Sequence, residues 1–301
     1  MGVLLVWYSL SKISITELIQ YFKNANYWWI GLGLLFGFLS HLSRAYRWKY
    51  LLEPLGYTLR FPNSIMAVFA TYLVNYTIPR AGEVTRATII TNYEGVPFEK
   101  GFGTIVSERV ADMIVLLGII AVTMSLQFDF IYNFLFSNIK PLKIVLVSIG
   151  LLVAWFLIFT YFKRSKSTFA LKIKNFLYGL IEGALSIFKM KHKWAFIGHT
   201  LFIWTMYVLM FYVTSFAVEE LQPIPMAAIL IGFIAGSFSI AATNGGIGSY
   251  PEAIVLAFLV FGLPEDPSRA FGWIMWASQT LMIIIVGGLS LIYLPIYNRK
   301  E

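Results

Sequence analysis

The sequence predicts an all-α polytopic membrane protein, and the observations that predict it are the composition and the spacing of the apolar residues. Hydrophobic residues make up 58% of the 301 positions and charged residues only 13%, whereas a soluble domain carries about 25% charged residues. Apolar runs of about 20 residues, the length that crosses the hydrocarbon core of a bilayer, recur along the chain. Lipid is therefore expected to surround most of the protein.

The apolar runs predict about six spanning helices. The residues at 1–10 are apolar but too few to span, and they lack the basic n-region of a signal peptide. We interpret them as the second half of a first helix whose beginning is missing from this sequence. The uninterrupted runs cover residues 28–48, 105–126, 142–162, 194–218 and 270–297.

Two further apolar stretches are interrupted, which predicts broken helices that re-enter the membrane. Residues 61–78 run into Pro79, which fixes its own φ and disfavours the helical conformation of the residue before it. Residues 224–242 run into a glycine-rich sequence at 243–252, and the apolar residues that follow stop at Gly262. Both segments must turn back rather than cross if the basic residues are to remain on one side of the membrane.

The two broken segments occupy matching places in the two halves of a single transmembrane domain, residues 1–301. A span that begins at Trp28 precedes the first segment, and a span that begins at Trp194 precedes the second. Interrupted helices at matching positions of inverted repeats are how many transporters build a site near the bilayer midplane. The sequence thus predicts an inverted repeat with halves of about 1–140 and 141–301.

The basic residues lie between the apolar spans, which predicts the orientation of the chain. The net charge of +8 would suggest nucleic acid as the partner of a soluble protein, but here it is typical of the positive-inside rule and of contact with anionic headgroups. The basic stretch 163–193 has apolar residues at helical spacing, which predicts an amphipathic helix on the inner leaflet. We expect a multi-pass protein of the bacterial plasma (inner) membrane with a cytoplasmic basic loop and C-terminus, and no nucleic-acid partner.

The residue inventory argues against several kinds of chemistry. The chain has no cysteine and only three histidines, His41, His192 and His199, so disulfides are excluded and a metal site is not expected. We expect His41 and His199 to lie at or near helix ends as ordinary polar residues. The glycine-rich sequence lacks the Gly-Lys-Ser/Thr ending of a nucleotide loop, so no cofactor is expected either.

The first candidate site surrounds the break at Pro79. A new helix that begins there would expose backbone N–H groups and the positive end of its dipole, which together attract an anion. Arg80 adds a guanidinium whose geometry suits phosphate, and Asn75 lies on the other side of the break. Glu83 and Arg86 are three residues apart and could pair on one helical face. The alternative is a solvated helix start that is neutralised by its own ion pairs.

The second candidate site lies in the next apolar span, where Glu108, Arg109 and Asp112 interrupt the hydrophobic residues. Glu108 and Asp112 share a helical face because they are four residues apart. Each charge at the bilayer centre would cost about 2.5–3.5 kcal/mol on insertion scales, so these charges must pair or face a polar cavity. We expect Arg109 to pair with one carboxylate and Arg80 or Arg86 with the other. The alternative is a charge cluster that only locks this helix to the broken segment.

The third candidate site is the glycine-rich sequence in the second half. Three glycines within four positions allow positive φ and let a ligand approach the backbone closely. Ser249 and Glu252 have the spacing of a capping box, so a helix should begin there with its N–H groups directed into the protein. The alternative is that Glu252 only caps this helix and that the glycines form a tight turn without a ligand. The candidate binding residues here are Asn244, Gly245, Gly246, Gly248 and Glu252.

These motifs, in this order, resemble those of the lysylphosphatidylglycerol synthase transmembrane family. The resemblance rests on Asn-x-x-x-Pro-Arg-x-Gly-Glu-x-x-Arg from Asn75 to Arg86, on Glu108-Arg109 with Asp112, and on Gly-Gly-x-Gly followed by Pro251-Glu252. It implies an inner-membrane protein that moves a lipid between leaflets, like the flippase domain of the multiple peptide resistance factor. Bifunctional members carry an aminoacyl transferase domain after the membrane part, whereas this sequence ends directly after its last span. The resemblance therefore implies transport rather than lipid aminoacylation.

Together these observations predict a lipid translocase rather than an enzyme. Two re-entrant helix pairs would direct their N-termini toward a charged cavity, where Arg80, Arg86 and Arg109 engage a phosphate headgroup. The expected substrate is an anionic or aminoacylated phospholipid or a polyprenyl-linked carrier, and the expected protein partner is a second copy or a separate transferase. Two other classes stay open: an intramembrane enzyme that uses Glu108 or Asp112 as a base, and a non-catalytic partner of a lipid-modifying or glycosyl transferase.

Overall fold

The part of the chain that can be described is entirely helical in its regular structure. A computed structural model gives the coordinates, and helices are the only regular elements within its described ranges. The prediction of an all-α protein is therefore confirmed for those ranges. The described residues are 2–78, 80–128, 150, 153, 156, 160 and 190–299.

The chain divides into two compact units, which are described separately. The first contains residues 1–109 and 190–301, and the second contains residues 110–189. The predicted span at 142–162 and the basic amphipathic loop at 163–193 lie almost wholly outside the described residues. Both stay predictions, and the candidate sites below belong to the first unit.

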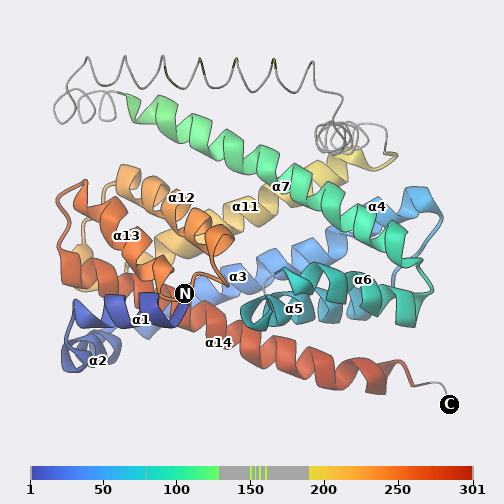
Figure 1. Cartoon of the computed structure of the whole chain (residues 1–301), viewed down its shortest axis with the longest axis horizontal. Coiled ribbons are helices and arrows are strands. Elements are labelled where there is room, and N and C mark those ends of the chain that lie inside the picture. The colour runs from blue at the N-terminus through green and yellow to red at the C-terminus, as the bar shows by residue number, and fades with distance from the viewer. Residues whose placement is uncertain are drawn as a thin grey trace. The chain divides into compact units, whose positions relative to one another are not determined.

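The N-terminal part of the chain forms a long helix, a pair of shorter helices and a second long helix, after two short leading helices (Figure 1). Polar side chains begin two of these helices, because Ser14 and Asn26 each accept a hydrogen bond from a backbone N–H of the following turn. The helices are α1 (Gly2–Ser11), α2 (Ile15–Asn24), α3 (Tyr27–Arg47), α4 (Lys49–Leu52), η1 (Glu53–Leu55), α5 (Phe61–Thr77), α6 (Ala81–Glu94) and α7 (Phe98–Leu126).

The C-terminal part repeats this order of long, short, short and long helices. That recurrence matches the order of apolar runs in the sequence, whereas inverted symmetry between the two halves stays a prediction. The helices are α11 (Lys193–Ser215), η2 (Glu219–Leu221), α12 (Met226–Ala242), α13 (Ser249–Leu259) and α14 (Glu265–Tyr297).

Two helices, α11 and α14, are long and apolar enough to cross a membrane by themselves, among the residues that the structure describes. Both were predicted as spans, and they begin within a few residues of the predicted positions. The number of crossings and the re-entrant course of α5–α6 and α12–α13 stay predictions.

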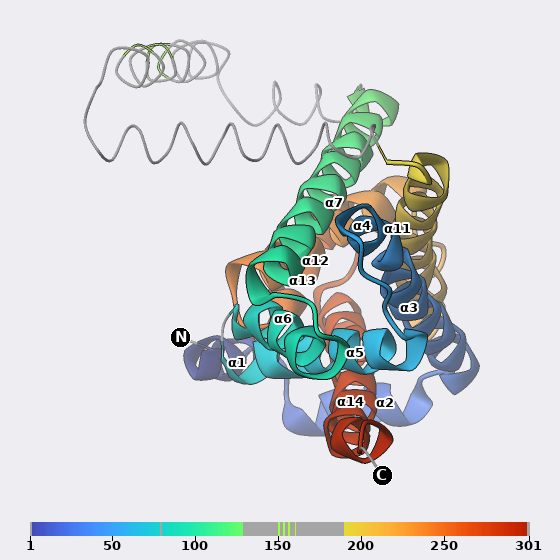
Figure 2. The same ribbon diagram turned by 90° about the vertical axis from the view of Figure 1, so that its right-hand side faces the viewer.

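The long helices α3 and α11 pack side by side and antiparallel, as Figures 1 and 2 show. Gly33 near the start of α3 faces Thr214 near the end of α11, and a Cβ at Gly33 would lie only 2.2 Å from the Thr214 hydroxyl oxygen. Toward the other ends of the helices, Ser43 hydrogen-bonds to His199. The missing side chain of Gly33 therefore allows the two backbones to approach each other closely.

The two helix breaks meet each other in the first unit. Tyr76 at the end of α5 packs on Gly245, where a Cβ would lie 2.3 Å from the Tyr76 ring. Both sides are fixed to α14, because the Gly245 carbonyl accepts a hydrogen bond from Trp276 at 2.8 Å and the Tyr76 hydroxyl accepts one from Thr280 at 3.2 Å. Segments about 170 residues apart in sequence are thus brought together by packing on one helix.

Candidate functional site

Three arginines surround one glutamate in the interior of the first unit. Within 3.4 Å of the Glu108 Oε1 atom lie Arg44 Nη1 at 2.8 Å, Arg86 Nη1 at 3.0 Å and Arg47 Nη2 at 3.4 Å. Arg86 also donates to Glu108 Oε2 at 3.2 Å. All four side chains are buried, so we call these residues, Arg44, Arg47, Arg86 and Glu108, the arginine cluster.

Neighbouring side chains hold the arginine cluster in place. The Arg86 guanidinium lies 3.8 Å from the centre of the Trp48 ring, and the Trp48 indole N–H donates to Thr104 at 2.9 Å. Arg47 donates to the Thr200 hydroxyl at 2.7 Å. Stacking on an aromatic face and hydrogen bonding to hydroxyl groups replace part of the hydration that a buried guanidinium loses.

Three guanidiniums of the arginine cluster share the Glu108 carboxylate. Asp112, the next acidic residue along α7, is also buried.

A second ion pair beside the first helix break is partly open to the surroundings. Arg109 Nη2 donates to Glu83 Oε1 at 2.8 Å, and the two side chains are 40% and 21% exposed. The Asn75 amide nitrogen lies 3.5 Å from the other Glu83 oxygen. The predicted pairing of Glu83 with Arg86 is wrong, because Arg86 turns to the buried Glu108 while Glu83 binds Arg109.

The predicted anion site at the start of the helix after the break is largely occupied by the chain itself. The helix α6 begins at Ala81 rather than at Pro79, which lies outside the described residues. The Ala81 amide donates to the Ile78 carbonyl at 3.2 Å, and the Gly82 amide donates to the Asn75 side-chain oxygen at 2.8 Å. Two of the donors expected to meet a ligand are therefore already used.

Arg80, the N-cap residue of α6, has a backbone conformation that only glycine adopts easily. Its φ is +59°, and among the described residues it is the only non-glycine residue with positive φ. Its side chain is exposed. Left-handed backbone at a non-glycine residue is strained and occurs often at functional sites.

Glu252 lies in a second cluster, with partners that the sequence did not suggest. It accepts hydrogen bonds from Ser9 at 2.6 Å and from Arg269 Nε at 2.9 Å, and Trp273 in turn donates to Ser9 at 3.2 Å. Arg269 is buried and also binds Glu265 at 2.7 Å. The charged residues of the two halves therefore form separate ion clusters instead of converging on a single cavity.

The predicted capping box in the second half is wrong. Gly248 is the N-cap residue of α13, and it has no side chain with which to cap. Ser249 instead shares hydrogen bonds with Ser239 at 2.6 Å and Thr243 at 2.9 Å, while Glu252 turns to Arg269. The hydroxyl groups thus fasten the end of α12 to the beginning of α13.

The glycines of this turn have the predicted conformation, but protein atoms occupy the space around them. Gly245, Gly246 and Gly248 have φ of +63°, +79° and +70°. A Cβ at Gly248 would lie 2.3 Å from the backbone nitrogen of Val6, and one at Gly245 would contact Tyr76. Asn244 contributes its carbonyl to the turn, where it accepts from the Ile247 amide at 3.4 Å. Close approach at this turn therefore serves packing against α1 and α5.

Comparison with known proteins identifies the family. The model of the family described as lysylphosphatidylglycerol synthase TM region matches residues 1–287. The chain belongs to this family. A relative, the UPF0104 membrane protein MJ1595 from Methanocaldococcus jannaschii, is 24% identical over 287 residues, which cover 87% of this chain and 83% of that protein. The resemblance inferred from the motifs is thereby confirmed, and the chain is a membrane protein of a family associated with lipid handling.

In this member of the lysylphosphatidylglycerol synthase TM family, several functional candidates were missed from the sequence. Arg44, Arg47 and Arg269 were not among the candidate residues that the sequence predicted. The spacing of Arg44 and Arg47, three apart at the end of an apolar run, is the signal that could have placed them on one buried face. Ser9 carried no signal, because its partner Glu252 is 243 residues away.

The two histidines predicted near helix ends lie within helices. His41 is buried in α3 against aromatic rings, with its ring centre 4.5 Å from that of Tyr72 and 5.2 Å from that of Phe69. His199 lies in α11 and shares a hydrogen bond with Ser43 at 2.8 Å. No group of three or more residues that could hold a metal ion occurs in the described ranges.

Proposed function

We propose that this chain is a lipid translocase that moves a phospholipid headgroup between leaflets along its charged interior. One observation carries the proposal: the partly exposed Arg109–Glu83 pair joins α7 to α6, the two helices that also supply Glu108 and Arg86 to the buried arginine cluster. Apolar helices surround these charges. Membership of a family named for a lysylphosphatidylglycerol synthase supports a phospholipid as substrate.

The physical task of a translocase is to shelter a charged headgroup from hydrocarbon. An ion loses most of its hydration free energy in an apolar medium, and a paired, hydrogen-bonded environment restores part of it. Polar and charged groups that line a path are therefore sufficient to speed the movement, while the acyl chains remain in lipid.

Arg109 is the residue that we assign to the headgroup phosphate. Its guanidinium is 40% exposed and is held by Glu83, which is itself partly exposed and lies near Asn75. A phosphate that reaches Arg109 replaces the Glu83 carboxylate, and Glu83 takes the guanidinium back when the lipid leaves. The arginine cluster keeps α6 and α7 together beneath this pair, because Arg86 of α6 donates to both oxygens of Glu108 of α7.

The test is translocation of a fluorescent phospholipid in proteoliposomes that contain the purified protein. In Arg109→Gln the rate should fall roughly 10- to 100-fold, since a charge-assisted hydrogen bond contributes about 1.5–3 kcal/mol. The matched control is Arg60→Gln, because Arg60 is also half-exposed and paired, at 3.0 Å with Glu94. The control should translocate lipid at the parental rate.

Three results would contradict the proposal. Chemical turnover of the lipid would show an intramembrane enzyme instead. Equal translocation by the parental protein and Arg109→Gln would contradict the role of Arg109, and no translocation by a folded parental protein would favour a non-catalytic partner of a transferase. Folding of each variant is checked by a single symmetric peak in size-exclusion chromatography in detergent.

A further inference from the structure

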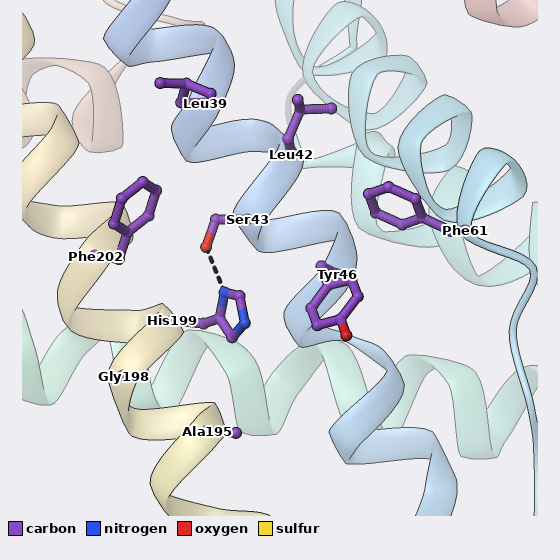
Figure 3. A pocket seen from close by; sticks show the side chains of 9 residues that line it. All are labelled: Leu39, Leu42, Ser43, Tyr46, Phe61, Ala195, Gly198, His199 and Phe202. Carbon is purple, nitrogen blue, oxygen red and sulfur yellow. Dashed lines mark hydrogen bonds between the residues drawn. The ribbon is translucent and has the colours of Figure 1, made fainter.

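A groove of about 620 Å³ runs along the surface between α3 and α11. Figure 3 shows it between the two helices, with Leu39, Leu42 and Tyr46 from α3 and Gly198, His199 and Phe202 from α11 around it. Its volume lies within the range of about 300–1,000 Å³ that is typical of ligand pockets. This groove is not part of the arginine cluster or of the Arg109–Glu83 pair.

The residues of α11 that line the groove include the small Ala195 and Gly198. A Cβ at Gly33 would lie 2.2 Å from the Thr214 hydroxyl oxygen, whereas the groove lies toward the opposite ends of the two helices, around the hydrogen bond between Ser43 and His199. Gly198 has no heavy atom within 4 Å of an added Cβ. The space above Gly198 is therefore open and available to an occupant.

Most of the groove wall is apolar, and its polar groups gather toward one end. Figure 3 shows His199 bound to Ser43 through one ring nitrogen, with the other nitrogen on the side of Tyr46. The Lys49 ammonium lies 3.5 Å from the centre of the Tyr46 ring and 4.9 Å from that of Tyr50. The groove is thus an apolar slot that ends at the Tyr46 ring, and the Lys49 ammonium lies over this ring.

We propose that this groove binds one anionic phospholipid, with an acyl chain in the slot and the phosphate beside Lys49. An apolar slot on a membrane protein faces lipid, and an acyl chain matches its shape and chemistry. The charge selects the headgroup, because the Lys49 ammonium lies over the ring of Tyr46, which lines this end of the groove. Each basic residue near a membrane surface favours anionic lipids. The proposal does not depend on translocation.

The test is native mass spectrometry of the full chain with phosphatidylglycerol and phosphatidylcholine of identical acyl chains. The parental protein should retain one phosphatidylglycerol in preference to phosphatidylcholine. Gly198→Leu should lose this lipid at least tenfold, because the new side chain fills the slot. Gly31→Leu is the matched control, since Gly31 is also an exposed helical glycine with open space around its Cβ, and it should bind as the parental protein does.

The headgroup assignment is tested separately with Lys49→Gln. The preference for phosphatidylglycerol should fall about fivefold, which is the effect of about one basic residue near an anionic surface. Equal retention of both lipids by the parental protein would overturn the assignment of an anionic headgroup. Undiminished lipid binding by Gly198→Leu, or a dimer that Gly198→Leu dissociates, would overturn the groove as a lipid site.

A second measurement keeps the proposal testable if Gly198→Leu does not fold. The chain has no cysteine, so Gly198→Cys offers a single thiol for labelling by a maleimide. Phosphatidylglycerol micelles should slow the labelling several-fold relative to phosphatidylcholine micelles. Equal labelling rates in the two lipids would overturn the proposal, whereas a loss of translocation in the Arg109 experiment would leave it unaffected.

Discussion

Glu108 is the residue on which the arginine cluster depends. One of its oxygens lies within 3.4 Å of three guanidiniums that come from two other helices. Removing one partner of a buried ion pair costs far more than removing an exposed one, because the remaining charges lose compensation that water cannot supply. The free energy of unfolding should therefore fall strongly when this single carboxylate is removed.

We expect Glu108→Gln to lower the free energy of unfolding by about 3–5 kcal/mol. The control is Glu265→Gln, because that carboxylate also binds an arginine but is 50% exposed, and an exposed pair contributes about 0–1 kcal/mol. The measurement is the fraction of protein that remains folded after heating in detergent, followed by size-exclusion chromatography. Equal losses in the two variants would show that the cluster is not a buried ion network.

Replacing Arg80 by glycine should stabilise the protein, whereas replacing Glu108 should destabilise it. A left-handed backbone conformation costs a non-glycine residue about 1–2 kcal/mol, which glycine would avoid. Glycine also has more conformational freedom in the unfolded chain, which reduces this gain by about 0.4–1 kcal/mol. Arg80→Gly should therefore raise the free energy of unfolding by up to about 1 kcal/mol in the same heating assay. Arg80→Ala removes the same side chain but keeps the Cβ, so it should give no gain; an equal gain from alanine would refute backbone strain as the cause.

At the scale of the helices, α3 can pack closely on α11 because it has a glycine at the point of contact. Gly33 faces Thr214 at a distance that no Cβ can enter, whereas Gly31, half a turn away on α3, is exposed and has open space. Both glycines look alike in the sequence. Only the neighbour across the interface makes one of them necessary.

Gly33→Ala should lower the free energy of unfolding by about 1–3 kcal/mol, because the two helices must move apart to admit the methyl group. Gly31→Ala should raise it by about 0.5–1 kcal/mol, since alanine favours the helix and meets nothing. Thermal denaturation of both variants in one detergent gives the comparison. A loss of similar size in both variants would contradict the close contact with Thr214.

For the whole molecule, the central question is which side of the membrane each connection faces. The distribution of basic residues predicts the answer, yet several of the residues that were counted in it are buried in the structure. Arg44, Arg47 and Arg86 are buried among protein side chains, so they do not face headgroups as the positive-inside argument assumed. The predicted orientation therefore depends on the basic residues that remain exposed.

Single cysteines test this orientation without interference, because the chain has no cysteine of its own. Glu99 in the first turn of α7 and Glu219 after α11 are both exposed. Glu99→Cys should react with a membrane-impermeant maleimide only from the cytoplasmic side, and Glu219→Cys only from the other side. Labelling of both from one side would contradict the three crossings that are predicted between residues 99 and 219.

The sequence by itself determined the membrane class, the approximate position of the long apolar helices and the place of both breaks. These features depend on local properties: the length of an apolar run, the fixed φ of proline and the free φ of glycine. The family motifs were also readable, because they are short and lie at fixed spacing.

Only the tertiary structure decided which charges pair. Glu108 binds residues 22 and 64 positions away, and Glu252 binds Arg269 and the distant Ser9. The sequence suggested two partners for Arg86: a carboxylate of α7, or Glu83 three residues away on its own helix. Spacing alone did not choose between them. Side chains of different helices meet only where packing brings the helices together, and burial then selects the pairing that leaves the fewest uncompensated charges.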